Sequence, residues 1–214
     1  MNPPQGPARP TPLRLLLADD QALVRGAVAA LLALEPDLEV VSEVGRGDEV
    51  VAAALRTRPD VALLDVEMPG LDGVAACRAL RTAVPACQVL VLTTFGRPGY
   101  LQQALEAGAR GFVVKDTPAR ALADAVRRVH AGLRVLDPVL AADSLVHGPS
   151  PLSPRETDVL RESKEGGTVA DVARALGISQ GTTRNRLSSA IGKTGARTRA
   201  EAVRIAEANG WLLS

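Results

Sequence analysis

The sequence predicts an α/β fold, a doubly wound parallel sheet of five strands, followed by an all-α domain of four helices. Three observations support this prediction. Between residues 13 and 131, short apolar runs alternate with helical patterns, as expected for βα units joined by right-handed crossovers. The apolar runs are nearly continuous, as in a sheet that helices cover on both faces. From Leu152 onward only helical patterns remain.

The first domain is expected to hold five strand–helix units. The expected strands are the apolar runs at residues 13–18, 38–44, 61–65, 88–93 and 111–114. Apolar positions three and four residues apart predict helices at residues 21–34, 48–58, 74–83, 99–107 and 118–131. Pro59 ends the second helix, Pro69–Gly70 and Gly73 indicate a turn, and Pro118 suits the first turn of the last helix.

The four helices of the second domain have clear start and stop signals. Ser153 is an expected N-cap, followed by Pro154 in the first turn. The second helix covers residues 169–176 and ends at Gly177. Ser179 caps a third helix that runs to about residue 194, and the fourth covers residues 199–209.

These patterns divide the chain into four parts. Residues 1–12 contain five prolines and are expected to be a disordered tail. Residues 13–132 form the sheet domain, residues 133–149 a linker with Gly, Pro and Ser, and residues 150–214 the all-α domain.

Composition limits the function. Aromatic residues make up only 2% of the chain, which disfavours modules that stack nucleic-acid bases on aromatic side chains. From residue 150 onward, 10 basic residues face 7 acidic ones, whereas the rest has 15 against 17. The basic second domain permits contact with nucleic acid. No secretory signal or membrane-length apolar run is visible, so we expect a cytoplasmic protein without membrane insertion. Cys77 and Cys87 are expected to be reduced thiols.

Polar side chains occur where four expected strands end. Parallel strands bring their carboxyl ends to one rim, where ligands bind. The residues are Asp19, Asp20, Asp65, Thr93 and Lys115.

The three carboxylates repel each other without a cation and favour Mg²⁺, which accepts carboxylate and phosphate oxygens. Asp65 stands alone after the third strand and is the expected nucleophile for an aspartyl-phosphate. Lys115 and Thr93 would bind phosphoryl oxygens, and the backbone carbonyl of Glu67 would add a metal ligand. Taken singly, each residue also fits a structural role, as a helix cap, a solvated lysine or a strand-filling threonine. Their joint order favours the phosphoryl site.

The second domain contains a helix–turn–helix pattern at residues 169–192. Thr183, Leu187, Ala190 and Ile191 share one face of its second helix and are expected to pack inward. We expect base contacts from exposed polar residues and phosphate contacts near the helix end. The residues concerned are Thr182, Arg184, Asn185, Arg186 and Ser188, then Lys193, Arg197 and Arg199. The alternative is a solvated face on a small helical bundle.

Residues 13–131 resemble a response-regulator receiver domain. The segments LLLADDQALVRGAVAALL, VALLDVEMPGLDG, VLVLTTF and EAGARGFVVKD carry this resemblance. It implies a flavodoxin-like fold and phosphoryl transfer from a sensor histidine kinase to Asp65. It also implies Mg²⁺ held through Asp20, Asp65 and the Glu67 backbone, with Asp19 assisting. Thr93 and Phe112 match the family's switch pair.

Residues 150–212 resemble the LuxR-type helix–turn–helix, through LSPRETDVL, the GIS turn and RNRLSSAI. The whole chain thus resembles NarL/FixJ-type regulators, and TTFGRPGY and the C-terminal segment resemble the DesR-like branch. This implies promoter binding as a homodimer formed on phosphorylation through the fourth helix. Polar residues at Glu162, Ser163, Thr183 and Thr194, with Gly192 inside a helix, depart from the family pattern and predict a weakly stable DNA-binding domain.

The sequence therefore predicts a two-component transcription regulator and no enzyme. One alternative is a DNA-binding regulator that works without phosphorylation. Another is a phosphohydrolase that uses the same aspartyl-phosphate chemistry. Those enzymes need a second aspartate two residues after the nucleophile, usually on the first strand, whereas Asp65 follows the third strand and Glu67 occupies the second position.

Overall fold

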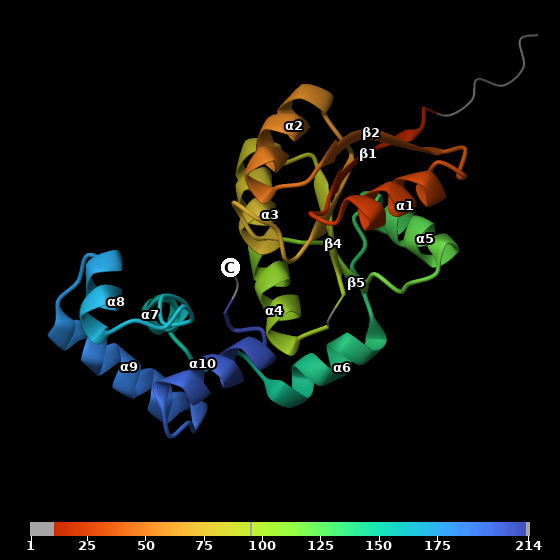
Figure 1. Ribbon diagram of the computed structural model, residues 1–214. Coiled ribbons are helices and arrows are strands. Elements are labelled where there is room, and N and C mark those ends of the chain that lie inside the picture. Colours follow the sequence, from red (N-terminus) through yellow and green to blue (C-terminus); the bar gives the residue numbers. More distant parts are fainter. Residues whose placement is uncertain (1–10, 95, 213–214) are drawn as a thin grey trace, which may run out of the picture. The chain divides into compact units, whose positions relative to one another are not determined.

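The computed structural model describes residues 11–94 and 96–212 (Figure 1). Most of the expected tail, residues 1–12, lies outside the described residues. The described chain forms two compact units. The first holds the residues up to Thr93 and Ala107–Val135, and the second holds Thr94–Glu106 and the residues from Leu136 onward.

The described part of the first unit is built on a sheet with strand order β2-β1-β3-β4-β5-β6. The first five strands are parallel neighbours, joined in register as in Leu15↔Val61 and Leu90↔Gly111. Their bounds are β1 (Leu13–Ala18), β2 (Leu38–Val44), β3 (Val61–Asp65), β4 (Gln88–Thr93) and β5 (Gly111–Val114). The predicted α/β fold and its five strands are thereby confirmed.

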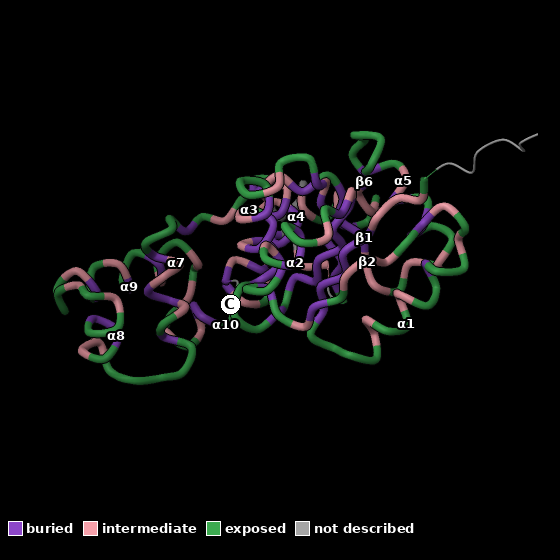
Figure 2. The backbone as a smooth tube through the Cα atoms, turned by 90° about the horizontal axis from the view of Figure 1, so that it is seen from above, coloured by how far each residue is buried: buried purple, intermediate pink, exposed green. Residues whose placement is uncertain are grey.

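Helices cover both faces of this sheet (Figure 1). Helices α1 (Ala22–Leu32) and α5 (Ala119–His130) lie together on one face. The short 3₁₀ turn η1 (Gly47–Glu49) and the helices α2 (Val50–Thr57) and α3 (Gly73–Ala83) lie on the other. Burial gathers in the strands, while the outer sides of the helices are exposed (Figure 2). This two-sided cover explains why the inner strands are largely apolar, whereas the edge strand β2 (LEVVSEV) carries exposed glutamates.

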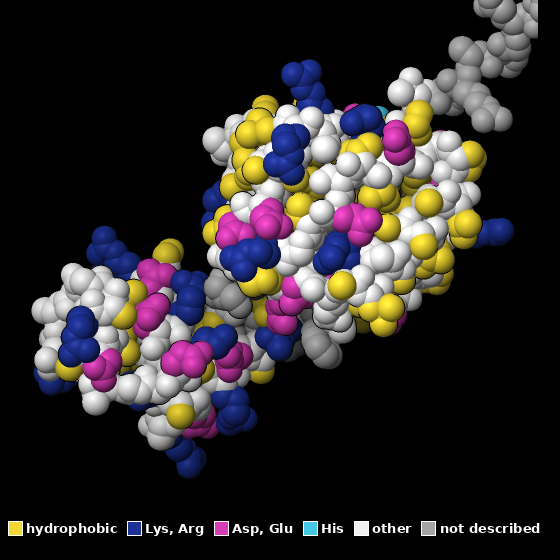
Figure 3. Space-filling view, turned by 45° about the horizontal axis from the view of Figure 1, so that its top comes forward, with side chains coloured by type: hydrophobic (Ala, Val, Ile, Leu, Met, Phe, Trp, Pro, Cys, Tyr) yellow, Lys and Arg dark blue, Asp and Glu magenta, His cyan; other side chains and the backbone are white. Residues whose placement is uncertain are grey.

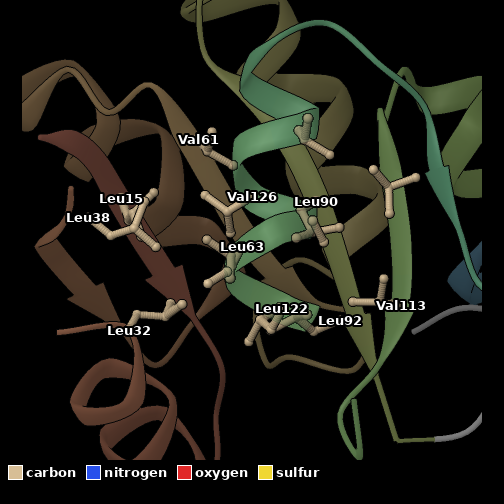
Figure 4. Close-up of a cluster of buried hydrophobic side chains, with 14 of the residues drawn as sticks. Leu15, Leu32, Leu38, Val61, Leu63, Leu90, Leu92, Val113, Leu122 and Val126 are labelled. Atoms are coloured by element: carbon tan, nitrogen blue, oxygen red, sulfur yellow. The ribbon is translucent and has the colours of Figure 1, made fainter. Parts of the chain in front are cut away.

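The core between the sheet and α5 depends on a stripe of apolar side chains. Leu122, Val126 and Val129 recur three and four residues apart on α5 and are buried. Figure 4 shows Leu122 and Val126 lying over Leu63 and Leu92 of the sheet. Each such side chain contributes about 1.5–3 kcal/mol through its removal from water. The core thus holds α5 against the strands whose ends carry the polar rim.

The second unit is helical. Its helices are α4 (Pro98–Ala107), α6 (Pro138–His147), α7 (Pro154–Arg161), α8 (Val169–Ala175), α9 (Gln180–Thr194) and α10 (Arg199–Ala208). Helices α7 to α10 enclose a core in which Val159, Leu160 and Ala190 are buried and Trp211 is partly buried. The predicted N-caps Ser153 and Ser179 are confirmed.

Helix α4 packs against the chain that follows α10. The Gly99 N–H donates to the carbonyl of Asn209 (3.0 Å), and Gln103 Nε2 donates to the carbonyl of Gly210 (2.7 Å). A Cβ atom at Gly99 would collide with both carbonyls, so glycine is required for this approach. These contacts explain why α4 belongs to the second unit.

Most of the expected linker at residues 133–149 has regular structure. It contains a sixth strand, β6 (Val135–Leu136), and helix α6. Asp137 caps α6 by accepting hydrogen bonds from the N–H groups of Val139 (2.9 Å) and Leu140 (3.1 Å), and Pro138 occupies the first turn. Asp137–Pro138 is thus the same start signal as Ser153–Pro154, a cap residue followed by a proline in the first turn.

Among the described residues, no helix combines the length and the apolar composition needed to cross a bilayer. Cys77 and Cys87 are buried free thiols, in agreement with the prediction.

Candidate functional site

The polar rim forms where the parallel strands end. Asp19 directly follows β1, Asp65 and Thr93 are the last residues of β3 and β4, and Lys115 directly follows β5. The Lys115 N–H donates to the carbonyl of Thr93 (2.8 Å), which continues the β4–β5 pairing to the rim. The sheet thus brings residues almost a hundred positions apart to one edge.

Lys115 joins two of the carboxylates. Its Nζ lies 2.7 Å from Asp19 Oδ2 and 2.9 Å from Asp65 Oδ2, and all three side chains are less than a tenth exposed. Asp20 is exposed, yet one carboxylate oxygen from each of Asp19, Asp20 and Asp65 lies within 4.8 Å of the others. The predicted carboxylates and ammonium therefore meet at one place.

The cluster carries more negative than positive charge. Burial raises the pKa of Asp65 to about 6; the ion pair with Lys115 opposes this rise, and the Asp19 charge adds to it. Burial also acts to lower the pKa of Lys115, but its interactions with Asp19 and Asp65 prevail and leave that pKa raised. The site therefore favours an added cation and a charged lysine.

This donor set fits a magnesium ion. Mg²⁺ prefers oxygen ligands and is held by one or two carboxylates beside phosphate oxygens and water. Asp19, Asp20 and Asp65 offer three carboxylates at suitable mutual distances. Glu67, whose backbone carbonyl is the expected fourth ligand, lies two residues beyond β3 and is exposed.

Thr93 and Phe112 differ in the part of the site they occupy. Thr93 is 3% exposed at the end of β4, next to the rim. Phe112 is fully buried within β5, with its backbone paired with Val91. The aromatic side chain is thus inward, the position expected of one state of the switch pair.

The loop after Asp65 is held close to the strand by a glycine. The Gly73 N–H donates to the carbonyl of Val66 (2.9 Å), and a Cβ atom at Gly73 would collide with the carbonyl of Asp65. Asp72 caps α3 by accepting a hydrogen bond from the Ala75 N–H (2.7 Å). The loop whose Glu67 carbonyl is the expected metal ligand is therefore tied to the strand end and to α3.

Sequence reasoning missed Arg25. Its Nη1 donates to the backbone carbonyl of Asp19 (2.5 Å), and its Nε lies 3.6 Å from Glu43 Oε2. Arg25 thus ties α1 and β2 to the start of the acidic cluster. Its position on the first turns of the helix that follows Asp19–Asp20 was the available signal.

Helix α9 is the second helix of the predicted helix–turn–helix, the one expected to contact DNA. Thr183, Leu187 and Ala190 are buried, as predicted. Arg184, Asn185 and Ser188 are exposed, with Thr182 and Arg186 half-buried at the sides. The polar residues expected to read bases are therefore on the outer face.

The residues expected to contact phosphates differ in their partners. Arg197 is exposed. Arg199 Nη2 donates to the carbonyl of Gly167 (2.9 Å), and Lys193 Nζ lies 2.7 Å from Glu156 Oε2. On the face seen in Figure 3, Lys and Arg side chains of the helical unit are interspersed with Asp and Glu. The basic charge is thus distributed and partly paired.

Three of the four unusual polar residues of this domain donate hydrogen bonds to backbone carbonyls four residues earlier. Ser163 Oγ donates to the carbonyl of Val159 (2.7 Å), Thr183 Oγ1 to Ser179 (3.0 Å) and Thr194 Oγ1 to Ala190 (2.9 Å). Because a buried hydroxyl is costly mainly when it lacks a partner, these residues cost less stability than the sequence suggests. Weak stability of this domain stays a prediction.

Comparison with known proteins gives matches along most of the chain. Residues 15–127 match the response regulator receiver domain, and residues 150–206 match the bacterial regulatory proteins of the luxR family. An uncharacterised transcriptional regulatory protein of Bacillus subtilis, YvfU, is 40% identical over 94% of this chain and 100% of its own length. The transcriptional regulatory protein DesR of the same organism is 38% identical over 94% of this chain and 99% of its own.

Two solved structures show the same fold. The response regulator ChrA of a heme-sensing two-component system is 33% identical, with a TM-score of 0.57, and the match covers 92% of this chain and 96% of ChrA. The structure of a two-component response regulator, RcsB, in complex with DNA has a TM-score of 0.63 at 23% identity, over 92% of this chain and 99% of RcsB. The second likeness supports the fold alone.

Proposed function

Because the chain belongs to the two-component response regulators, with a receiver domain and a LuxR-type DNA-binding domain, we propose that phosphorylation of Asp65 controls its binding to promoter DNA. The phosphodonor would be a sensor histidine kinase, and the protein would act in the cytoplasm. The family consists of transcriptional regulators, so we expect no turnover of a metabolic substrate.

One observation carries the proposal for Asp65. The buried Lys115 ammonium lies within 3 Å of two carboxylates, and a third carboxylate stands beside them. One positive charge cannot neutralise three negative ones, and close carboxylates repel each other. The excess of negative charge suits a site that receives a cation, and the cation can in turn hold a phosphoryl oxygen.

The chemistry follows from the positions of these side chains. A carboxylate oxygen of Asp65 attacks phosphorus, the phosphorus–nitrogen bond to the kinase histidine breaks, and the histidine keeps that bond's electron pair. The Lys115 ammonium exchanges part of its ion pair with Asp65 for a phosphoryl oxygen. Thr93, at the same rim, can donate its hydroxyl to another phosphoryl oxygen.

A magnesium ion would be held by Asp19, Asp20, Asp65 and the carbonyl of Glu67. When bound, Mg²⁺ supplies neutralisation of the carboxylate and phosphoryl charges. Movement of Thr93 toward the phosphoryl group would be coupled to Phe112, which is already inward.

The output would be a change in DNA affinity through dimerisation. Phosphorylation adds charge and acceptor oxygens at the rim and biases a two-state domain. A homodimer presents two α9 helices to two half-sites about one helical turn apart. On each α9, Arg184, Asn185 and Ser188 would face bases, with Thr182 and Arg186 at the sides. Arg197 and Arg199 would approach phosphates.

The proposal is tested with purified full-length protein, Mg²⁺ and acetyl phosphate. Intact-mass spectrometry should show an added phosphoryl group on the wild type and on Asp124→Asn, a control in which an exposed carboxylate of α5 is changed. Asp65→Asn should show none, and only the phosphorylated proteins should gain DNA affinity. Equal phosphoryl uptake by Asp65→Asn would refute the assignment.

Two other functions predict different results. Equal dimerisation and DNA affinity of wild type and Asp65→Asn, with and without acetyl phosphate, would favour a regulator that works without phosphorylation. Sustained release of phosphate from small phosphoesters would favour a phosphohydrolase. The carboxylate–lysine cluster favours neither over the proposed switch.

A further inference from the structure

Glu156 links the first helix of the DNA-binding domain to the recognition helix. Its side chain is 8% exposed. One carboxylate oxygen, Oε2, accepts hydrogen bonds from the N–H and the hydroxyl of Ser153 (2.7 and 2.8 Å) and from Lys193 Nζ (2.7 Å). The other, Oε1, accepts one from the Ser189 hydroxyl (2.6 Å). One carboxylate therefore contacts α7 at its start and α9 at two places.

A capping box alone does not require this arrangement. In a capping box, the glutamate needs only to reach back to the N–H of the cap residue. Here the remaining acceptor positions of Glu156 are used by α9, although Ser189 and Lys193 are 33 and 37 residues away from it in sequence. The carboxylate thus fixes α9 at the point where α7 begins.

Ser189 and Lys193 lie four residues apart, on one side of α9. At about 100° per residue, this side falls between the buried face with Leu187 and Ala190 and the exposed face with Arg184. A contact at the side of a helix resists rotation of the helix about its axis. The apolar contacts below α9 are adaptable by comparison, whereas hydrogen bonds to a charged group are short and directional.

We infer that Glu156 is a positioning residue that sets the rotation of α9 and neutralises Lys193, so that Lys193 supports the recognition helix instead of contacting a DNA phosphate. The inference rests on the proposed function, in which α9 reads DNA. It replaces the phosphate contact that the sequence suggested for Lys193. The low pKa of Glu156, about 2, agrees with a carboxylate that stays charged: burial raises it, and the hydrogen bonds from Lys193, Ser189 and Ser153 outweigh burial.

The two roles of Glu156 have opposite effects on two kinds of DNA binding. Loss of the contact lets α9 rotate and moves Arg184 and Asn185 away from the bases, which weakens binding to the preferred sequence. It also frees the Lys193 charge and removes a negative charge, which strengthens sequence-independent binding to phosphates. A general loss of folding in the domain would instead weaken both specific and sequence-independent binding.

The experiment uses the full-length protein treated with acetyl phosphate and Mg²⁺. The specific probe is the duplex that wild type selects from a random-sequence library, and the non-specific probe is a random-sequence duplex of equal length. Affinities are measured over a series of salt concentrations for Glu156→Gln, Lys193→Met, Ser189→Ala and Arg197→Met. Glu165→Gln, which removes an exposed negative charge, is the matched control.

We expect Glu156→Gln to lower the ratio of specific to non-specific affinity about tenfold or more, a loss of about 1.4 kcal/mol or more, while its non-specific affinity does not fall. Ser189→Ala should lower the ratio about threefold. Arg197→Met, which removes an exposed residue proposed to approach a phosphate, should reduce the slope of log affinity against log salt by about 0.9, the value for one phosphate contact. Lys193→Met should leave that slope unchanged.

Three results would overturn the inference. They are an unchanged ratio in Glu156→Gln, an equal loss on both probes, and a slope in Lys193→Met that falls as in Arg197→Met. If Glu156→Gln does not fold, Ser189→Ala and Lys193→Met decide the matter alone. Failure of the proposed function is distinct, because wild type would then select no duplex and Arg197→Met would change nothing.

Discussion

The two domains each contain a buried carboxylate paired with a lysine, but the two pairs have opposite character. In the receiver, Lys115 faces Asp19 and Asp65, with Asp20 beside them, and the pKa of Asp65 is raised to about 6, chiefly by burial. In the DNA-binding domain, Glu156 accepts hydrogen bonds from Lys193, Ser189 and Ser153, and its pKa is lowered to about 2.

The difference separates a site that does chemistry from a site that holds structure. A carboxylate whose acceptor positions are all used by hydrogen bonds has no free position for a further ligand. Buried carboxylates that outnumber their cation repel each other and gain from a metal ion, which can in turn accept a phosphoryl oxygen. An excess of buried negative charge, more than the presence of a lysine, therefore distinguishes the proposed phosphoryl site from the Glu156 cluster.

The largest expected effect is on the satisfied cluster. Glu156→Ala should lower the free energy of unfolding of the second unit by about 3 kcal/mol, because it removes a buried carboxylate that accepts four hydrogen bonds, one of them from the half-exposed Lys193, and with it the capping box of α7. Urea unfolding followed by the fluorescence of Trp211, which is the only tryptophan and packs on this core, measures it. Asp171→Ala, in the exposed capping box of α8, is the control and should cost clearly less, because its side chain lies in water. Equal losses would remove the distinction drawn here.

The next effect is a difference in pH dependence. The folded pKa of Asp65 is above its unfolded value of 3.8, so the folded receiver binds a proton more readily than the unfolded chain. Its free energy of unfolding should then rise by about 2–3 kcal/mol as the pH falls from 7 to 4 in metal-free protein. The stabilisation from Glu156 is fully present above the unfolded value of 4.5 and is lost only as the pH falls through about 2.

Amide hydrogen exchange checks this difference, with β3 reporting on the receiver and α9 on the second domain. Protection of β3, corrected for the intrinsic exchange rate, should rise between pH 7 and pH 5, and Asp65→Asn should remove most of that rise. A rise of the same size in Asp65→Asn would show that another group causes it.

The smallest expected effect changes sign with the metal ion. Asp20→Asn removes one of three close negative charges, so it should stabilise the metal-free receiver by roughly 1 kcal/mol. In excess Mg²⁺ it should be less stable than wild type, because weaker binding gives less stabilisation. Thermal unfolding in EDTA and in Mg²⁺ tests both signs, with Asp124→Asn as the control. The same sign in both conditions would contradict a metal site at these carboxylates.

Much of the receiver could be predicted from its sequence, and the reason is periodicity. The five parallel strands have the predicted bounds, since each is a short apolar run bounded by turn residues. Helix ends differ by up to two residues, as at α1, because end residues depend on hydrogen bonds that periodicity does not describe. The rim residues were found because strand ends must meet on one edge.

The remaining features depend on contacts that are distant in sequence. Helix α6 is the exception, because its start is signalled locally by Asp137 and Pro138. The local pattern at Glu156 indicates only a capping box and does not show that its carboxylate reaches Ser189 and Lys193. The charge of Lys193 alone predicts a phosphate contact, whereas the structure pairs it with Glu156. Local sequence predicts elements well and predicts the partners of long charged side chains poorly.

The close approach of Gly73 to the carbonyl of Asp65 has a consequence for protein engineering. Grafting the acidic residues and the lysine onto another parallel sheet would reproduce the charges but would leave the following loop free to swing outward wherever a side chain occupied the position of Gly73. A transplanted site would need a glycine at this position as much as it needs the charged side chains. Sensors built from this scaffold should therefore exclude position 73 from randomisation.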